Sequence, residues 1–301
     1  RGHDVSFLME QGTKEFAQFV KNETAEIHSI TGHNDLIDWV EKRDPEWVIL
    51  DGYQFTAELE RRLKELSGVL TIDDTAHRPR YEPTLLLNQN LPAENSWYTS
   101  KGMEKSRLLL GLRYVLLRRQ FLRYQSEQRK PCTDMKNLLI TLGKSKHKNV
   151  MSTVLDGLRP MTNQFQEIRV LGTDSSYGKS LPSVRFNPHV QNVAELMSTM
   201  DIAISGGGST IYELAFMGIP TLGITVAENQ EKIIESFQKQ GALISLGSGR
   251  DLTAEKTTEA IDTLIQDDCK RIQMAQKGLN LIDGTGAKRL FNHLRRYKNK
   301  Q

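Results

Sequence analysis

The stretch from Asp201 to Gln230 reads DIAISGGGSTIYELAFMGIPTLGITVAENQ. It begins with a short apolar run typical of a buried strand, passes through three glycines, and continues as a helical pattern that starts at Ser209. A second apolar run, at residues 221–226, follows the helical pattern. The stretch therefore predicts a strand, a turn, a helix and a strand in succession, which is the repeating unit of a parallel α/β sheet.

The glycines between the first strand and the helix predict a phosphate site. Glycine lets a ligand approach the main chain, and the first turn of a helix offers N–H groups and a positive dipole end to an anion such as a diphosphate. We expect these contacts from Gly207, Gly208, Ser209 and Thr210. Glu213 lies about one helical turn beyond Ser209, where a carboxylate suits the two hydroxyls of a ribose. Tight packing alone is the alternative reason for such a turn.

Two common nucleotide motifs are missing from this stretch. Gly206-Gly207-Gly208 is followed by Ser209, Thr210 and Ile211 rather than by another glycine, so the G-x-G-x-x-G signature is absent. No Gly-Lys-Ser/Thr follows the glycines either, which excludes a P-loop.

Strand-like apolar runs alternate with helical patterns in both halves of the chain, which predicts two parallel α/β sheets. A polar span at residues 124–133 separates the halves and predicts domains at residues 1–130 and 131–301. The expected strands span residues 5–9, 26–30, 47–50, 69–72, 138–142, 167–171, 184–186, 202–204, 221–226 and 242–246. The expected helices span residues 14–21, 35–42, 57–66, 150–158 and most of 253–297.

Composition narrows the classes of function. The chain has 301 residues, enough for two domains, and a formal net charge of +3, which implies no general attraction to nucleic acid. Cys132 and Cys269 are far apart and lie in no CxxC motif, so neither a disulfide scaffold nor a zinc site is expected. No carboxylate cluster has the spacing of a dedicated Mg²⁺ or Zn²⁺ site, and we expect no metal and no cofactor.

The sequence predicts a cytoplasmic protein without stable membrane insertion, since it contains no signal-peptide core near residues 1–11 and no long apolar run. Residues 108–124 are apolar with interspersed arginines. They predict an element that packs beneath an interdomain cleft, with a basic amphipathic helix lying on a membrane as the alternative. The sequence does not indicate an oligomeric state.

Polar residues that close the apolar run at residues 69–72 are candidates for catalysis. Asp73 and Asp74 follow the run directly, and His77 and Arg78 come next. A histidine suits proton transfer near neutral pH, and among the histidines of this chain His77 is the best candidate, with Asp73 and Asp74 ordering it or binding sugar hydroxyls. The alternative is a helix cap with a local ion pair between an aspartate and Arg78.

Other strand-end residues are candidates for substrate contacts. Asp51 and Tyr53 end the run at residues 47–50 and offer a carboxylate and a phenol to the same edge of the sheet. Asn88 and Asn90 follow the apolar residues 85–87 and offer uncharged donors and acceptors suited to acetamido and hydroxyl groups. As an alternative, the two asparagines serve as turn residues.

The chain resembles the GT-B sugar-nucleotide enzymes. Within them it is most similar to the UDP-2,4-diacetamido-2,4,6-trideoxy-β-L-altropyranose hydrolases of pseudaminic acid biosynthesis and to related spore-coat polysaccharide proteins. Besides residues 205–230, the resemblance rests on residues 1–7 (RGHDVSF), 71–74 (TIDD), 85–90 (LLLNQN), 114–118 (YVLLR) with Phe121, and 282–289 (IDGTGAKR).

The resemblance implies two Rossmann-like domains that face a cleft, and a hydrolase that releases UDP and a free diacetamido-trideoxy sugar. It also implies that Asn229 and Gln230 hold the donor sugar and the pyrophosphate. A GT-B glycosyltransferase with a UDP-sugar donor and a non-catalytic UDP-sugar-binding protein are the alternatives. In each case the partner is a small-molecule UDP-sugar.

The chain departs from the family pattern at two places. The family's presumed catalytic histidine belongs to a Gly-x-Gly-His-x-x-Arg turn that would precede Arg1, so we expect a chain truncated at its amino terminus, in which His3 is not that residue. Residues 142–148 read LGKSKHK where relatives carry a Gly-Gly-Ser/Thr-Asp-like turn. Lysine side chains there would replace main-chain phosphate contacts or accompany a different ligand.

Overall fold

The computed structural model describes residues 4–10, 26–124, 135–143, 148–173, 181 and 183–298. The chain divides into two compact units. The first unit comprises Arg1–Asn88 and Asn95–Leu109, and the second unit comprises Gln89–Glu94 and Leu110–Gln301.

This division falls earlier in the sequence than the expected break at residue 130. Residues 110–124 belong to the second unit, because Leu112, Val115 and Phe121 are buried in one of its cores. Arginines separate these apolar residues in the sequence and hide the pattern. Residues 125–134 lie outside the described residues, so the expected linker stays a prediction.

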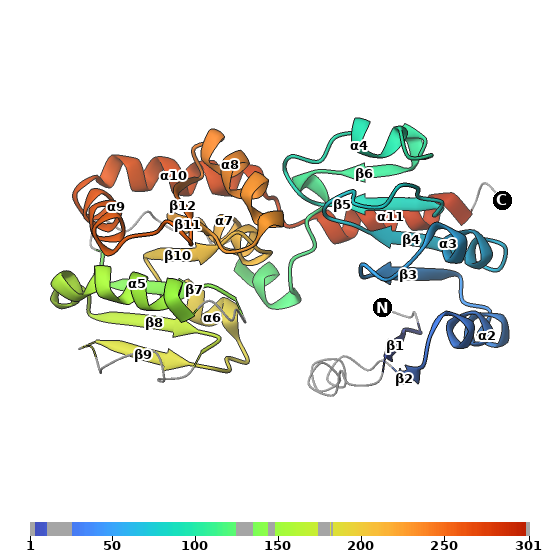
Figure 1. The fold of residues 1–301 in the computed structure, drawn as a ribbon, viewed down its shortest axis with the longest axis horizontal. Coiled ribbons are helices and arrows are strands. Elements are labelled where there is room, and N and C mark those ends of the chain that lie inside the picture. Colours follow the sequence, from blue (N-terminus) through green and yellow to red (C-terminus); the bar gives the residue numbers. More distant parts are fainter. Residues whose placement is uncertain are drawn as a thin grey trace. The chain divides into compact units, whose positions relative to one another are not determined.

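The second unit contains a six-stranded sheet in the order β12-β11-β10-β7-β8-β9 (Figure 1), with parallel pairing between all neighbours. The strand order reverses between β7 and β10. In open α/β sheets, ligands bind beyond the carboxyl ends of the strands at such a point of reversal. The strands are β7 (Asn137–Thr141), β8 (Glu167–Leu171), β9 (Val184–Asn187), β10 (Ile202–Gly206), β11 (Thr221–Thr225) and β12 (Leu243–Ser248).

Both faces of this sheet are buried, which explains its continuous apolar strands. Along β10, Ile202 and Ile204 enter one hydrophobic core and Ala203 enters the other. Helix α5 packs against α9, and α7 packs against α10. The helices of this unit are α5 (Lys148–Leu158), α6 (Val193–Ser198), α7 (Thr210–Phe216), α8 (Glu231–Lys239), α9 (Ala254–Gln266), α10 (Asp268–Leu281) and α11 (Gly286–Lys298).

The first unit contains a sheet in the order β3-β4-β5-β6 and a separate parallel pair of β1 and β2. Strands β3, β4 and β5 are parallel, so their carboxyl ends share one edge. The strands are β1 (Ser6–Glu10), β2 (Glu26–Ile30), β3 (Trp47–Asp51), β4 (Gly68–Ile72), β5 (Leu85–Asn88) and β6 (Leu108–Leu110). The helices are α2 (His33–Arg43), α3 (Ala57–Lys64) and α4 (Ser96–Thr99).

The expected strands and most expected helices are confirmed within about two residues. The expected helix at residues 14–21 lies outside the described residues. The alternative of an amphipathic helix at residues 108–124 is wrong. That segment consists of the end strand β6 and two short 3-10 helices, η2 (Leu112–Tyr114) and η3 (Arg119–Tyr124), whose apolar side chains turn into the core.

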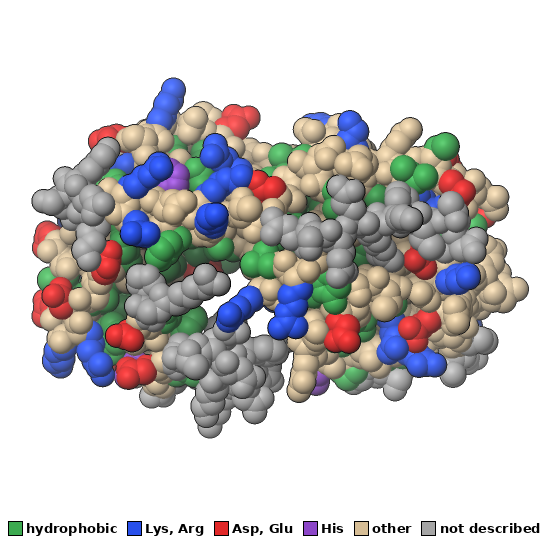
Figure 2. Space-filling model, turned by 180° about the vertical axis from the view of Figure 1, so that it is seen from behind, with side chains coloured by type: hydrophobic (Ala, Val, Ile, Leu, Met, Phe, Trp, Pro, Cys, Tyr) green, Lys and Arg blue, Asp and Glu red, His purple; other side chains and the backbone are tan. Residues whose placement is uncertain are grey.

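The surface matches the nearly balanced charge of the chain. Lys and Arg side chains are interspersed with Asp and Glu side chains on the face shown in Figure 2. Within the described ranges, no helix has both the length and the apolar character needed to cross a bilayer. The described side chains also include no cluster of three or more His, Cys, Asp or Glu residues that could hold a metal ion.

Candidate functional site

The glycine turn, Gly206, Gly207 and Gly208, follows β10 at the point where the strand order reverses. None of the three glycines has a left-handed backbone, so conformation does not require glycine here. A Cβ atom on Gly207 would lie 2.7 Å from the Cβ of Gln230 and 2.9 Å from Cγ1 of Ile234, so close packing explains this glycine.

Gly208 differs from its neighbour. A Cβ atom built there would find its nearest atom, Nε2 of Gln230, 3.9 Å away. Neither backbone strain nor packing within the described residues therefore accounts for a glycine at this position. Among the residues that the structure describes, none fills the side of Gly208 that a side chain would occupy, at the carboxyl edge of the sheet. This arrangement lets a ligand reach the main chain.

The start of α7 lies next to this opening. The helix begins at Thr210 with Ser209 as its N-cap, as expected, and the Ser209 side chain makes no capping hydrogen bond. Ser209 is exposed, whereas Gly207 is buried. The first N–H groups of a helix lack acceptors within the helix, so those near Ser209 and Thr210 are available to an anion.

The side chain of Gln230 connects the two neighbouring strand ends. Its Oε1 accepts hydrogen bonds from the backbone N–H of Gly207 at 2.9 Å and of Val226 at 3.2 Å. Because only the amide oxygen can accept from two N–H donors, the amide orientation is fixed and its NH₂ group lies on the side of Gly208. Asn229, in the short 3-10 helix η6 (Glu228–Gln230), is exposed.

Glu213 lies in the first turn of α7, and its side chain is only 8% exposed. Its carboxylate accepts two hydrogen bonds from Arg118, at 2.6 Å from Nε to Oε1 and 2.8 Å from Nη2 to Oε2. The guanidinium also lies over the ring of Phe121, with Cζ 5.2 Å from the ring centroid. The structure thus adds a part-buried bidentate ion pair to the residue expected to bind ribose.

Residues 89–94 attach to the same part of the second unit. Oδ1 of Asn90 accepts a hydrogen bond from the hydroxyl of Tyr212, the residue before Glu213. Oε1 of Gln89 accepts the N–H of Leu116 at 2.9 Å. Asn90 is only 7% exposed, so its visible role is to anchor this segment to α7.

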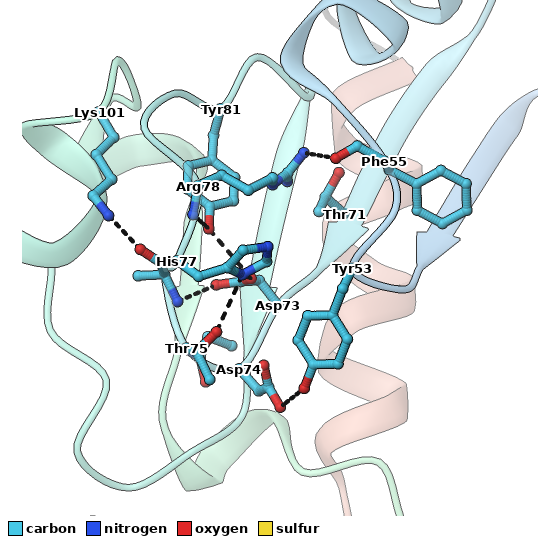
Figure 3. A network of polar contacts seen from close by, with 12 residues as sticks. Tyr53, Phe55, Thr71, Asp73, Asp74, Thr75, His77, Arg78, Tyr81 and Lys101 are labelled. Atoms are coloured by element: carbon cyan, nitrogen blue, oxygen red, sulfur yellow. Dashed lines mark hydrogen bonds and ion pairs between the residues drawn. The ribbon is translucent and has the colours of Figure 1, made fainter. Parts of the chain in front are cut away.

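In the first unit, Asp73 is the centre of a buried network (Figure 3). Its carboxylate accepts hydrogen bonds from the Tyr98 hydroxyl at 2.6 Å, the Tyr81 hydroxyl at 3.3 Å and the Ala76 N–H at 2.7 Å. The Tyr98 hydroxyl in turn accepts from Nδ2 of Asn88 at 2.6 Å. Burial, and then the charge of Asp73, raise the pKa of Tyr81 to about 12 and raise the pKa of Tyr98 as well. Both phenols therefore remain protonated donors to Asp73.

The alternative prediction for this place, a helix cap with a local aspartate–arginine pair, is wrong. Asp73 caps a turn, because no helix follows it, and Arg78 pairs with Glu60 at 2.7 Å instead. Glu60 is fully buried and also accepts the hydroxyl of Thr71 at 2.6 Å. A buried glutamate needs such partners, and helix α3 brings it to Arg78 from a distant part of the sequence.

His77 and Asp74 lie beside this network (Figure 3). Asp51 is the last residue of β3, which pairs in parallel with β4, so its end of the strand lies at the same edge of the sheet. Nδ1 of His77 lies 3.2 Å from Oγ1 of Thr75 and 3.7 Å from Oδ1 of Asp73, and the side chain is 40% exposed. The Tyr53 hydroxyl donates a hydrogen bond to Asp74 at 2.6 Å. The Tyr53 and His77 rings lie edge to face, with their centroids 5.3 Å apart. Partial burial, and then the nearby Asp74 carboxylate, raise the pKa of Asp51.

The structure therefore groups the sequence-predicted residues into a set in each unit. The second unit brings the glycine turn, Glu213 and Gln230 together, and the first unit brings His77, Asp73 and Asp74 together. Asn88 is fully buried against Tyr98, which gives it a structural role. Residues 144–147, which include Lys144, Lys146 and His147 of LGKSKHK, lie outside the described residues, as does Cys132.

Several partners in these sets were not assigned roles from the sequence. They are Arg118, Glu60, Tyr81 and Tyr98. Arg118 carries one usable signal, since it belongs to the family-like segment YVLLR. The two tyrosines and Glu60 carry none, because the polar sequence around each of them gives no sign that its side chain is buried.

Curated proteins from several organisms are similar to this chain. An uncharacterized protein of Methanocaldococcus jannaschii is 25% identical over 69% of this chain and 46% of its own length. The spore coat polysaccharide biosynthesis protein SpsG of Bacillus subtilis is 26% identical over 51% of this chain and 48% of its own length. The UDP-2,4-diacetamido-2,4,6-trideoxy-β-L-altropyranose hydrolase of Campylobacter jejuni is 25% identical over 69% of this chain and 76% of its own length. The chain spans about half the length of the first two.

Solved structures show the same fold. MurG of Acinetobacter baumannii superposes with a TM-score of 0.70 at 14% identity, over 98% of this chain and 91% of that chain. The UDP-GlcNAc 2-epimerase of Neisseria meningitidis bound to UDP-GlcNAc superposes with a TM-score of 0.64 at 13% identity, over 98% of this chain and 100% of that chain. These likenesses confirm the predicted fold class, two Rossmann-like α/β units of the GT-B type. Residues 125–290, more than half of the chain, match the glycosyltransferase family 28 C-terminal domain, and the chain belongs to that family.

Proposed function

We propose that the second unit binds the UDP part of a UDP-sugar. The observation that carries the proposal is Gly208 at the reversal of strand order, where neither backbone strain nor packing among the described residues explains a glycine. Because the N–H of Gly207 already donates to Gln230, the diphosphate is assigned chiefly to the N–H groups of Gly208, Ser209 and Thr210. Glu213 accepts the ribose hydroxyls, one turn into α7.

The comparisons support a UDP-sugar as the ligand. One relative is named as a hydrolase of a UDP-sugar, and one structural neighbour was solved with UDP-GlcNAc bound. In the proposal, the amides of Asn229 and Gln230 contact the ligand. Asn88 and Asn90 support the fold, since their side chains are buried and already engaged.

The reaction proposed for this ligand is hydrolysis in the synthesis of a nonulosonic acid or a surface polysaccharide. Water adds to the anomeric carbon, the bond from that carbon to the diphosphate oxygen breaks, and UDP leaves with the bonding electrons. The proton of the water passes to a base. His77 is the candidate base in this chain. Because Asp73 and Thr75 lie near its Nδ1, we assign acceptance of the proton to its other ring nitrogen, Nε2.

Glycosyl transfer is the second candidate. The family 28 match favours it, because that family is named for glycosyl transfer. Transfer uses the same nucleotide half and replaces water with an acceptor hydroxyl. The remaining alternative, a non-catalytic UDP-sugar-binding protein, requires only the proposed UDP contacts of the second unit.

Calorimetry with UDP, and with GDP as a matched control, tests the binding proposal directly. UDP binding without GDP binding is expected, and the absence of UDP binding would contradict the proposal. NMR of the protein mixed with the UDP-diacetamido-trideoxy sugar then tests the reaction. Release of UDP and free sugar without an acceptor supports hydrolysis, and release that depends on an added acceptor supports transfer.

A further inference from the structure

Two segments of the second unit, far apart in the sequence, carry only basic charges. Residues 110–124 contain four arginines and residues 284–298 contain five Lys or Arg residues, whereas neither segment contains an Asp or a Glu. The net charge of the whole chain is +3, so the other residues together carry a net charge of −6, which is +3 less the +9 of these segments. The positive charge of the chain is therefore concentrated in the two segments.

The fold brings these segments together. Helix α11 packs against the 3-10 helix η2. The Tyr114 hydroxyl lies 3.2 Å from Nε2 of His293, and Nη1 of Arg289 donates to the backbone oxygen of Arg113 at 2.9 Å. We call the exposed basic side chains of the two segments the basic surface. They are Arg113, Arg119, Arg123, Lys288, Arg295 and Arg296.

Carboxylates near the basic surface are already engaged. Glu213 accepts hydrogen bonds from Arg118, and Asp283 accepts hydrogen bonds from Arg289. Five members of the basic surface form no ion pair with any other residue that the structure describes, namely Arg113, Arg123, Lys288, Arg295 and Arg296. The basic surface therefore keeps positive charge for an anion from outside the described chain.

The pKa of His293 reflects these positive surroundings. Burial, and then the nearby Arg296 and Arg113, lower the pKa of His293. The two arginines come from different segments and act on one imidazole. Like charges held this close repel each other, and an anionic partner would relieve that repulsion.

Exposed apolar side chains lie in the same two segments. Leu116, Leu122 and Phe291 are 36%, 37% and 39% exposed. Phe291 lies on the same side of α11 as Lys288 and Arg295, because residues three and four positions apart on a helix are neighbours. A bilayer presents anionic headgroups above an apolar layer, whereas the backbone of a nucleic acid presents phosphates alone. The mixture of basic and apolar side chains therefore fits a bilayer better.

We propose that the basic surface binds the headgroups of an anionic lipid bilayer, so that the protein associates reversibly with a membrane surface without insertion of a helix. This contact differs from an amphipathic helix at residues 108–124, because core residues such as Phe121 stay buried. The proposed UDP site is not needed for it, and the two proposals are tested separately.

The test measures co-sedimentation of the protein with lipid vesicles. One set of vesicles contains phosphatidylcholine alone, and the other also contains about one quarter phosphatidylglycerol. The protein is expected to bind the anionic vesicles and not the neutral ones. Because salt screens exposed charges, binding is expected to weaken about tenfold or more between about 0.1 M and 0.5 M salt.

Charge-matched double variants locate the contact. Each basic side chain near an anionic bilayer contributes about fivefold in affinity, so Arg295→Gln with Arg296→Gln is expected to weaken vesicle binding about twentyfold. Lys239→Gln with Lys277→Gln removes the same charge from exposed sites of α8 and α10 and is expected to keep wild-type binding. Thermal unfolding checks the fold of each variant.

A single apolar variant tests the contribution of the exposed ring. Phe291→Gln keeps all basic charges and is expected to weaken vesicle binding about threefold or more, because the ring no longer enters the headgroup layer. UDP affinity is expected to be unchanged in this variant and in both double variants.

Three results would overturn the inference. Absence of binding to the anionic vesicles would remove it, whatever the outcome for UDP. Equal weakening by the two double variants would show that net charge, and not the basic surface, causes binding. Binding of single-stranded DNA that the Arg295 and Arg296 changes abolish, without binding of vesicles, would assign the surface to a nucleic acid instead.

Discussion

Gln230 accepts the backbone N–H of Gly207 at 2.9 Å and, with the same oxygen, that of Val226 at 3.2 Å. This oxygen holds together the turns that follow β10 and β11, and it directs the NH₂ group of Gln230 toward the side of Gly208. The residue therefore has two parts with separate tasks, an oxygen that braces the turns and an NH₂ group that can donate to a bound anion.

Gln230→Glu separates these tasks. The carboxylate can still accept both N–H groups, so the free energy of unfolding is expected to change by about 0.5 kcal/mol or less. The second oxygen then replaces the NH₂ group, and its charge is expected to weaken UDP binding about tenfold or more. Gln238→Glu is the matched control, since Gln238 also accepts a backbone N–H, from Ser245, but lies later in α8. Equal UDP affinity in the two variants would contradict the assignment.

Gly207→Ala is expected to lower stability, whereas Gly208→Ala is expected to weaken UDP binding. A Cβ atom at Gly207 would overlap Gln230 and Ile234, so Gly207→Ala is expected to lower the free energy of unfolding by about 1 to 3 kcal/mol. Gly208→Ala meets nothing closer than 3.9 Å and is expected to change stability little while weakening UDP binding. Denaturation and calorimetry check both. Full UDP affinity in Gly208→Ala would show that no ligand approaches that side of the turn.

Tyr98→Phe is expected to destabilise the first unit by about 1 to 3 kcal/mol, because it leaves the buried Asp73 and Asn88 without their shared hydroxyl. Tyr53→Phe is the control, since Tyr53 is 60% exposed and its hydroxyl donates to Asp74 near the surface. Chemical denaturation measures both. Equal losses would show that the network around Asp73 adds no stability beyond that of a surface hydrogen bond.

Asp283 gives a pH-dependent contribution to stability. Its hydrogen bonds to Arg289, and then to Thr285, lower the pKa of Asp283 to about 2 from 3.8, against the opposing effect of partial burial. Because the folded-state pKa is the lower one, the stabilisation is present above about pH 4 and is lost as the pH falls toward 2.

Asp283→Asn is therefore expected to destabilise the protein at pH 7 by less than about 1 kcal/mol, since Asp283 is half exposed. The difference from wild type is expected to shrink as the pH falls from about 4 toward 2, as followed by urea denaturation. Asp262→Asn, at an exposed site in α9, serves as the control. A difference that does not depend on pH would contradict the assigned ion pair.

The sequence predicted the parts of the fold that depend on local pattern. Apolar runs such as Ile202–Ala203–Ile204 mark strands buried on both faces, and the glycines with Ser209 mark the turn and the helix start. The Arg118–Glu213 pair was not predicted, because the two residues are 95 positions apart and only the packing of residues 110–124 against α7 brings them together. The buried role of Asp73 was missed for the same reason, since Tyr98 lies 25 positions away.

Calorimetric titration of UDP into the wild-type protein and Glu213→Ala tests the central claim most directly, that the glycine turn and α7 form a UDP site. We predict that the wild-type protein binds UDP and that the variant binds it about tenfold or more weakly, because loss of a ribose hydroxyl contact costs about 1 to 3 kcal/mol. Unchanged UDP affinity in a folded Glu213→Ala protein would contradict the account.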